Sequence, residues 1–207
     1  MLPLGDDETL VLKDGELRLW PAFVQSAERA GILAALRAET HWEQSEIRIA
    51  GRRIPIPRLN AWYGDAGAHY SYSGVRLITH PWTPLLADLK RRVEACTGVA
   101  FNSALVNLYR DGADSVDWHA DDEPELGEAP QVASLSVGAV RRFELKHRTI
   151  PGERYRLDLP DGSLLLLAGP LQHHWLHRVP KQPGIAGSRV NITFRTVRHA
   201  PGQGRQR

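Results

Sequence analysis

The sequence predicts an α+β fold in which helices come first and a jelly-roll core of short strands follows. Its 207 residues, 42% hydrophobic and 24% charged, are enough for a domain with a substantial core. Two helical patterns occur before residue 100, and alternating strand patterns separated by turn residues follow it. The chain has no internal repeat and no long linker, so we expect one domain over residues 1–207.

The first helix is expected over Ser26–Glu39, with Ser26 as N-cap and Glu28 in the first turn. Its apolar residues recur at helical spacing: Ile32, Leu33 and Leu36. The second runs from Pro84 to Gly98, with proline at its start and glycine at its end. One side of it is apolar, with Leu85, Leu86, Leu89 and Val93.

Residues 101–198 are expected to form the jelly-roll core. The strand patterns in this range are SALVNLY, QVASLSVG, RRFELKH, YRLDLP, SLLLLAG, HHWLHRV and RVNITFRTV. Two to three further strands are expected between Glu46 and Ile78. Residues 1–9 and 199–207 carry no apolar pattern and are expected to be loose ends.

Composition indicates the cellular compartment of the protein more clearly than its function. The formal charge is +2, but 22 arginines stand against 4 lysines, which fits either nucleic-acid contact or a genome that favours arginine codons. The longest apolar run, Leu164–Ala168, is far shorter than the roughly 20 residues of a membrane helix. No secretory signal is visible and Cys96 stands alone, so we expect a cytoplasmic protein without disulfides or membrane contact.

An acidic stretch around one histidine, DSVDWHADDEPELG, is the first candidate site. His119 and Asp121 lie two residues apart, so on extended backbone they point to the same side. A second histidine from HHWLHRV (His173, His174 or His177) would complete the two-histidine, one-carboxylate set of non-haem Fe(II) oxygenases. The H-x-D spacing alone also fits a histidine in a solvated loop.

The last strand pattern alternates strictly. Val190, Ile192 and Phe194 form an apolar face, opposite a polar face of Arg189, Asn191, Thr193 and Arg195. The two arginine Cα atoms are expected roughly 20 Å apart, so the guanidiniums suit opposite ends of a short dicarboxylate. Asn107 and Tyr109 share a polar face in the same way. The alternative is an edge strand with this face in solvent.

Four segments in this order resemble the AlkB family of Fe(II)- and 2-oxoglutarate-dependent dioxygenases: NLYRDGADSVDWHADDE, ASLSVGAVRRFEL, WLHRVPK and RVNITFR. The likeness spans roughly residues 58–197 and is greatest to the branch that repairs N-alkylated bases. It implies a double-stranded β-helix core with a nucleotide-recognition hairpin lid, placed here at 43–80. The reaction it implies converts 2-oxoglutarate and O2 to succinate while an N-methyl group is hydroxylated and lost as formaldehyde.

The resemblance also implies roles for individual residues. His119, Asp121 and His177 would bind Fe(II). Arg189 and Arg195 would pair with the carboxylates of 2-oxoglutarate, in an order left open. The other residues of the co-substrate pocket would be Asn107, Tyr109, Asn191 and Thr193.

For the substrate, the resemblance implies that Asp122 and Glu123 face the base and favour a cationic lesion such as 1-methyladenine or 3-methylcytosine. Tyr72 would stack on the flipped base, and Tyr70 and Ser73 would reach base or backbone. The remaining acids of the stretch, Asp114, Asp117 and Glu125, are expected to be solvated loop.

The segment IRIAGRRIPIPR predicts a basic hairpin that turns at Gly51. Its four arginines are expected to contact phosphates: Arg48, Arg52, Arg53 and Arg58. Ala50 stands at its tip, where duplex-active relatives carry a bulky aromatic. A methyl group is a poor wedge, so we expect a preference for single-stranded or already unpaired DNA. RNA is a further expected partner, and we expect a monomer. The alternative is a dioxygenase of the same fold that acts on a protein or small molecule.

Overall fold

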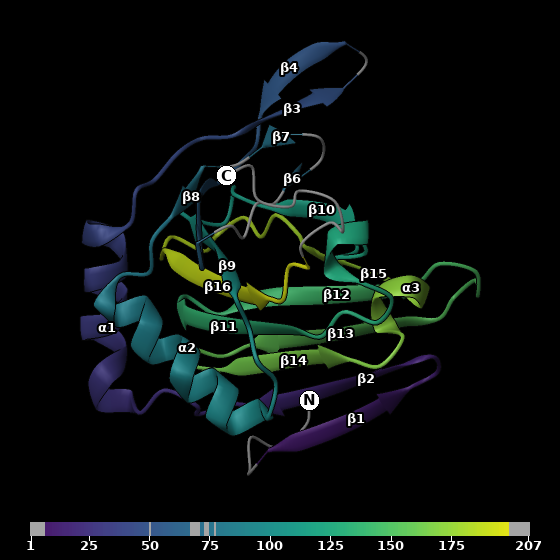
Figure 1. Ribbon diagram of the computed structural model, residues 1–207. Coiled ribbons are helices and arrows are strands. Elements are labelled where there is room, and N and C mark those ends of the chain that lie inside the picture. Colours follow the sequence, from purple (N-terminus) through teal and green to yellow (C-terminus); the bar gives the residue numbers. More distant parts are fainter. Residues whose placement is uncertain (1–6, 50, 67–70, 73–74, 77, 199–207) are drawn as a thin grey trace, which may run out of the picture.

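The computed structural model describes residues 7–49, 51–66, 71–72, 75–76 and 78–198. Two β-sheets make up most of this part of the chain, and helices cover one side of the larger sheet (Figure 1). None of the helices in the described residues is long and apolar enough to cross a membrane.

The larger sheet has eight strands. Their order is β1 (Glu8–Leu12), β2 (Gly15–Trp20), β14 (Leu164–Ala168), β11 (Val132–Gly138), β16 (Arg189–Arg195), β9 (Ser103–Tyr109), β5 (Leu59–Gly64) and β8 (Thr79–His80). All neighbouring pairs are antiparallel except β5 with β8. The polar strand β16 is therefore central, which excludes the exposed edge strand left open by the sequence.

The smaller sheet has four strands, in the order β10 (Val116–His119), β15 (Trp175–Val179), β12 (Arg141–His147) and β13 (Arg154–Leu159). Two separate hairpins are formed by β3 (Glu46–Ile49) with β4 (Arg52–Pro55), and by β6 (Ser71–Tyr72) with β7 (Val75–Arg76). The β3–β4 hairpin projects from the top of the molecule in Figure 1. A short helix, α3 (Leu171–His174), leads into β15, and a 3-10 turn covers Pro124–Leu126.

Both predicted helices form. In α2 (Pro84–Thr97), Thr83 Oγ1 accepts the N–H of Leu86 at 3.2 Å, and Gly98 ends the helix with φ at 72°. In α1 (Ser26–Glu39) the prediction of Ser26 as N-cap is wrong. Gln25 is the capping residue, with extended backbone and no side-chain hydrogen bond, and Ser26 is already helical.

The larger sheet uses its two faces differently. One face packs against the helices in a core that includes Leu36 of α1, Leu89 of α2, and Val106, Ile192 and Phe194 of the sheet. The opposite face meets the smaller sheet, where Leu165 and Leu167 lie in one cluster with Phe143 and Trp175. Since Ile192 and Phe194 of β16 lie in the helix-side core, the polar residues that alternate with them face the smaller sheet.

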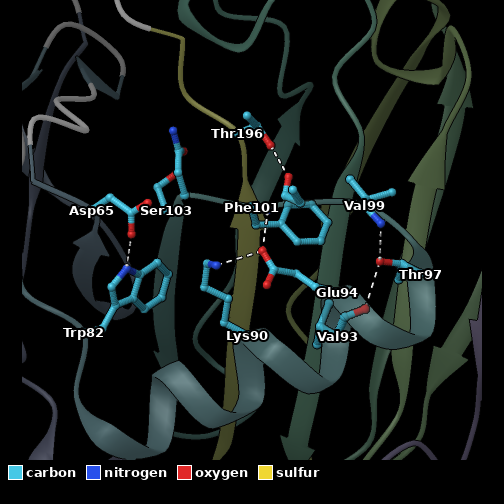
Figure 2. Close-up of polar contacts among 12 residues, drawn as sticks. Asp65, Trp82, Lys90, Val93, Glu94, Thr97, Val99, Phe101, Ser103 and Thr196 are labelled. Atoms are coloured by element: carbon cyan, nitrogen blue, oxygen red, sulfur yellow. Dashed lines mark hydrogen bonds and ion pairs between the residues drawn. The ribbon is translucent and has the colours of Figure 1, made fainter.

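Polar contacts attach the end of α2 to the neighbouring strands, as Figure 2 shows. Glu94 accepts from Lys90 and from the backbone N–H of Phe101, both at 2.8 Å. Thr196 donates to the carbonyl of Ala100 at 2.6 Å. Phe101 precedes β9 and Thr196 follows β16. These contacts therefore fix the adjacent ends of the two strands that carry the predicted polar faces, with Asn107 on β9 and Asn191 on β16.

The structure differs from the predicted organisation in two places. The loose segment expected over 1–9 already contains part of β1, because Leu10 and Leu12 pack against the inter-sheet core. Strands β1 and β2 therefore precede the helices and extend the larger sheet. Five strands, not two to three, lie between Glu46 and Ile78 in the described residues, because each of the two hairpins contributes a pair.

Candidate active site

His119, Asp121 and His177 come together at the rim of the smaller sheet. His119 ends β10 and is paired in register with His177 of β15. One potential ligand atom from each of the three residues lies within 4.8 Å of the others. The two imidazole rings are 4.3 Å apart between centroids. The strand pairing thus brings the distant histidine to the H-x-D motif.

The surroundings of His119 leave one ring nitrogen for a metal. Its Nδ1 lies 2.8 Å from the carbonyl oxygen of Asp117, so Nδ1 carries the proton and donates it. The Nε2 lone pair is then available for coordination. Burial lowers the pKa of His119 more than the Asp121 carboxylate raises it, which keeps the ring neutral as a ligand requires.

Asp121 is 1% exposed, yet it is held as a carboxylate. Burial alone would raise its pKa, but the charge and hydrogen bond of the Arg195 guanidinium, together with the two neighbouring imidazoles, outweigh that effect and set the pKa at about 2. Arg195 Nη2 donates to Asp121 Oδ1 at 2.7 Å. The backbone N–H of Asp121 donates to Gln172 Oε1 at 3.0 Å.

His177 is also buried and neutral. Burial, together with the neighbouring His119, lowers the pKa of His177 to about 3. Its ring stacks on Phe143 at 5.3 Å between centroids. Two neutral imidazoles and one carboxylate on one face form the ligand set that suits Fe(II), so the residues present fit this metal.

A cavity between the two sheets adjoins the three ligands. The polar face of β16 lines it, as the alternation predicts, while the apolar face lies in the helix-side core. Ser134 and Ser136 on the neighbouring β11 accept from Asn191 Nδ2 (2.8 Å) and Arg189 Nη2 (2.9 Å). The predicted co-substrate residues that line the cavity are Asn107, Tyr109, Arg189, Asn191, Thr193 and Arg195.

Arg189 brings into this cavity a cation that is only partly hydrogen-bonded. It is 1% exposed, and burial lowers its pKa to about 10, which leaves it charged at neutral pH. Its guanidinium lies 5.2 Å from the ring centre of Tyr109. Nε and Nη1 are buried without a hydrogen-bond partner among the described residues. A buried donor group of this kind fits a ligand carboxylate such as that of 2-oxoglutarate.

Arg58 does not lie where the sequence predicts. It was expected to contact phosphates, but it is 4% exposed and lines the cavity. Its Nε donates to Asn107 Oδ1 at 3.0 Å and its Nη1 to the carbonyl of Ser115 at 3.2 Å. Because both acceptors are inside the fold, the side chain points inward rather than to solvent. The phosphate-contact prediction for Arg58 is therefore wrong.

The predicted substrate residues are only partly placed. Asp122 is exposed and pairs with Arg148 at 2.5 Å, and Glu123 is half-buried; neither lines the cavity. Tyr72 lies in β6, but its side chain is not among those described. Tyr70 and Ser73 lie outside the described residues, as does Ala50. Their predicted roles remain predictions.

The remaining acids of the stretch differ from one another. Asp114 was expected to be solvated, but it is 4% exposed and its carboxylate accepts the backbone N–H and the guanidinium of Arg110, each at 2.8 Å. Asp117 is exposed and Glu125 half-buried. The solvated-loop prediction is therefore wrong for Asp114, which closes its own loop.

The other two histidines of HHWLHRV lie away from the metal ligands. His173 contacts the carbonyl of Glu128. His174 forms a second group with His147 and Asp14, in which one potential ligand atom from each residue lies within 4.8 Å of the others. His147 Nδ1 accepts the backbone N–H groups of Thr149 and Ile150, at 3.3 and 3.2 Å. Its Nε2 is therefore protonated and faces Asp14, which is unsuited to a metal ligand.

Three residues that support the site carry little signal in the sequence: Ser134, Ser136 and Gln172. Ser134 and Ser136 alternate with apolar residues in VASLSVG, a pattern that marks a polar face but not its partner. Gln172 precedes the histidines of the late strand and carries no local signal of its role. The role of Gln172 is visible only in the folded protein, where its side chain contacts the backbone of Asp121.

Comparison with known proteins agrees with this geometry. The model of the 2OG-Fe(II) oxygenase superfamily matches residues 16–195. "DNA oxidative demethylase ALKBH2" of Mus musculus is 40% identical over 160 residues, which cover 74% of this chain and 67% of that protein. The chain belongs to the AlkB family of 2OG-Fe(II) oxygenases.

Other AlkB proteins show the extent of the likeness. "Alpha-ketoglutarate-dependent dioxygenase alkB homolog 3" of Rattus norvegicus is 45% identical over 197 residues, covering 89% of this chain and 66% of that protein. The chain thus spans just under two thirds of that relative. The solved structure of OsALKBH1 matches 91% of this chain and 100% of its own with a TM-score of 0.65. At 16% identity, this match concerns the fold alone, which is the predicted jelly-roll.

Proposed function

We propose that this AlkB protein is an Fe(II)- and 2-oxoglutarate-dependent dioxygenase that removes methyl groups from N-alkylated bases such as 1-methyladenine and 3-methylcytosine in DNA. The observation that carries the proposal is the set of half-buried His119 with buried Asp121 and His177, beside a cavity into which Arg189 brings two guanidinium nitrogens without a partner among the described residues. The names of the relatives, an alpha-ketoglutarate-dependent dioxygenase and a DNA oxidative demethylase, support the same reaction.

In this reaction, 2-oxoglutarate and O2 become succinate and CO2, with one oxygen atom inserted into a C–H bond of the N-methyl group and the other entering succinate. The resulting N–CH2OH group breaks down to formaldehyde and the unmodified base. Bound Fe(II) supplies the oxidising chemistry. The chain contributes position: Arg189 would hold a carboxylate, Arg195 fixes Asp121, and the cavity between the sheets holds the co-substrate beside the three metal ligands.

For the substrate, we propose single-stranded DNA, with RNA as a further substrate. Arg52 and Arg53 are exposed on the β3–β4 hairpin and suit a phosphate backbone. The residue between Ile49 and Gly51 is alanine, whose methyl group is too small to fill the gap left by a flipped base. We also propose a cytoplasmic location, since Cys96 is the chain's single cysteine and fits a reducing compartment. We propose a monomer as the acting form.

The test is release of formaldehyde from an oligonucleotide that bears 3-methylcytosine, with Fe(II), 2-oxoglutarate and O2 supplied. We expect turnover, and none for His119→Ala. Absence of turnover with any methylated DNA or RNA, while 2-oxoglutarate is still converted to succinate, would favour a protein or small-molecule substrate. Equal or faster repair of the duplex than of the same single strand would contradict the strand preference.

A further inference from the structure

Gln172 connects the two segments that carry the metal ligands. It lies in α3, directly before β15 and five residues before His177, and it is fully buried. Its Oε1 accepts the backbone N–H of Asp121 at 3.0 Å. Because only the oxygen of an amide accepts a hydrogen bond from N–H, this contact also fixes the orientation of the side chain.

The backbone around Asp121 has little other support from the sheet. Strand β10 ends at His119, and its pairing with β15 shifts register between Val116 and His119. Asp121 therefore follows an irregular ladder and lies beyond its end. The carboxylate is held by Arg195 of β16, and the backbone by Gln172, so the ligand is braced from two separate elements.

The Nε2 group of Gln172 indicates that this residue does not stabilise the core. Nε2 is buried and has no hydrogen-bond partner among the described residues. An unpaired buried donor is unfavourable, and an unbranched apolar side chain of the same length would fill the same space without that cost. What the glutamine provides that methionine cannot is the accepting oxygen.

We propose that Gln172 is a positioning residue for the metal site. By accepting the N–H of Asp121, it holds this ligand at the distance from His177 that a divalent metal needs. The inference rests on the metal site of the proposed function but not on its substrate. It can therefore fail or hold whichever nucleic acid, if any, the enzyme acts on.

The test compares Gln172→Met with a matched substitution elsewhere, Gln182→Met. Like Gln172, Gln182 accepts a backbone hydrogen bond with its side chain: its Oε1 accepts the N–H of Arg142 at 2.8 Å. Its loop does not carry a metal ligand. Affinity is measured by anaerobic Fe(II) titration with 2-oxoglutarate present, following the visible charge-transfer band of the complex, and by Mn(II) titration.

We expect Gln172→Met to weaken metal binding by about 10- to 100-fold, as loss of contacts to a ligand usually does. Gln182→Met should bind metal as the wild type does. The melting temperature of the metal-free protein, recorded for both variants, shows whether each is folded. Gln172→Glu keeps an accepting oxygen at the same place; burial beside Asp121 raises the pKa of the new carboxyl group, so we expect it to be neutral and to retain most of the affinity.

Two results would overturn the proposal. One is a folded Gln172→Met protein with wild-type affinity for Fe(II) and Mn(II). The other is a Gln172→Glu protein that loses as much affinity as Gln172→Met, because the accepting oxygen would then not be what matters. Neither result depends on turnover of a methylated base.

Discussion

Arg195 Nη2 donates to Asp121 Oδ1 over 2.7 Å, and the two side chains are 3% and 2% exposed. One residue is a predicted co-substrate contact and the other a predicted metal ligand, so the two parts of the site are joined by a buried ion pair. Movement of β16 would therefore disturb metal and co-substrate binding together.

Breaking this pair should be costly. Arg195→Met leaves the Asp121 carboxylate buried without its cation, and we expect the metal-free protein to lose about 3–5 kcal/mol of unfolding free energy. Urea denaturation in the presence of a chelator measures this. The double variant Arg195→Met with Asp121→Asn removes both charges and should recover more than half of the loss. Additive losses would show that the pair is not coupled.

Replacing Arg189 should leave the stability of the metal-free protein intact but weaken the binding of 2-oxoglutarate. Arg189→Met removes a buried guanidinium with two unpaired nitrogens, so we expect the melting temperature of the metal-free protein to be unchanged or higher. The Kd for 2-oxoglutarate should rise by about 100-fold, which corresponds to about 2.7 kcal/mol for a lost charge-assisted contact. Calorimetric titration with Mn(II) in place of Fe(II) measures it. Unchanged 2-oxoglutarate affinity would remove Arg189 from the co-substrate site.

The metal-free protein should lose stability below about pH 6.5. Folded His177 has a pKa of about 3, whereas the unfolded chain protonates it near the ordinary value of 6.5. The unfolded state therefore binds more protons between these values. The stability from a neutral His177 is complete above pH 6.5 and is lost progressively as the pH falls toward 3.

The size of this dependence can be measured against a variant. One such group contributes a slope of about 1.4 kcal/mol per pH unit within this window. His177→Gln cannot take up the proton, so its slope between pH 6 and pH 5 should be smaller by about that amount. Denaturation curves in chelator at both pH values provide the comparison, and identical slopes for variant and wild type would contradict the assignment.

The exposed and buried arginines of the hairpin segment should differ in nucleic-acid binding. If Arg52 and Arg53 contact phosphates, their joint replacement by alanine should weaken binding of a single-stranded oligonucleotide and reduce its log–log salt slope by about 1.4. Arg58→Met should leave the salt slope unchanged, since Arg58 is buried against Asn107. Fluorescence anisotropy at several salt concentrations distinguishes them. A reduced slope for Arg58→Met would mean that this side chain reaches the phosphates after all.

Two glycines should respond in opposite directions to alanine. Gly31 is exposed within α1 and an added Cβ meets nothing within 4 Å, so Gly31→Ala should stabilise by about 0.4–1 kcal/mol. At Gly112 the added Cβ would collide with the backbone carbonyl of Gln182, and we expect a loss of about 1–3 kcal/mol. Urea denaturation of both variants tests the pair, and stabilisation by Gly112→Ala would contradict the packing described for that loop.

Much of the fold could be predicted because hydrophobic periodicity is local. The spacing of apolar residues placed α1 and α2, and strict alternation separated Ile192 from Asn191 on β16. The same locality placed His119 and Asp121 on one side of the backbone. The choice of His177 over His173 and His174 came from the resemblance, and the register of β10 with β15 is what brings it to the motif.

Local patterns in the sequence establish which residues share a face, in the two helices, in the strands of the jelly-roll, on the polar side of β16 and in the H-x-D motif. What lies opposite each face follows from the way the two sheets and the helices pack. This packing buried Arg58 against Asn107, paired Arg195 with Asp121, and placed Gln172 against the backbone of Asp121. Periodicity depends on neighbours along the chain. Contacts between residues about 50 or more apart depend instead on how whole sheets pack, which no short stretch of sequence specifies.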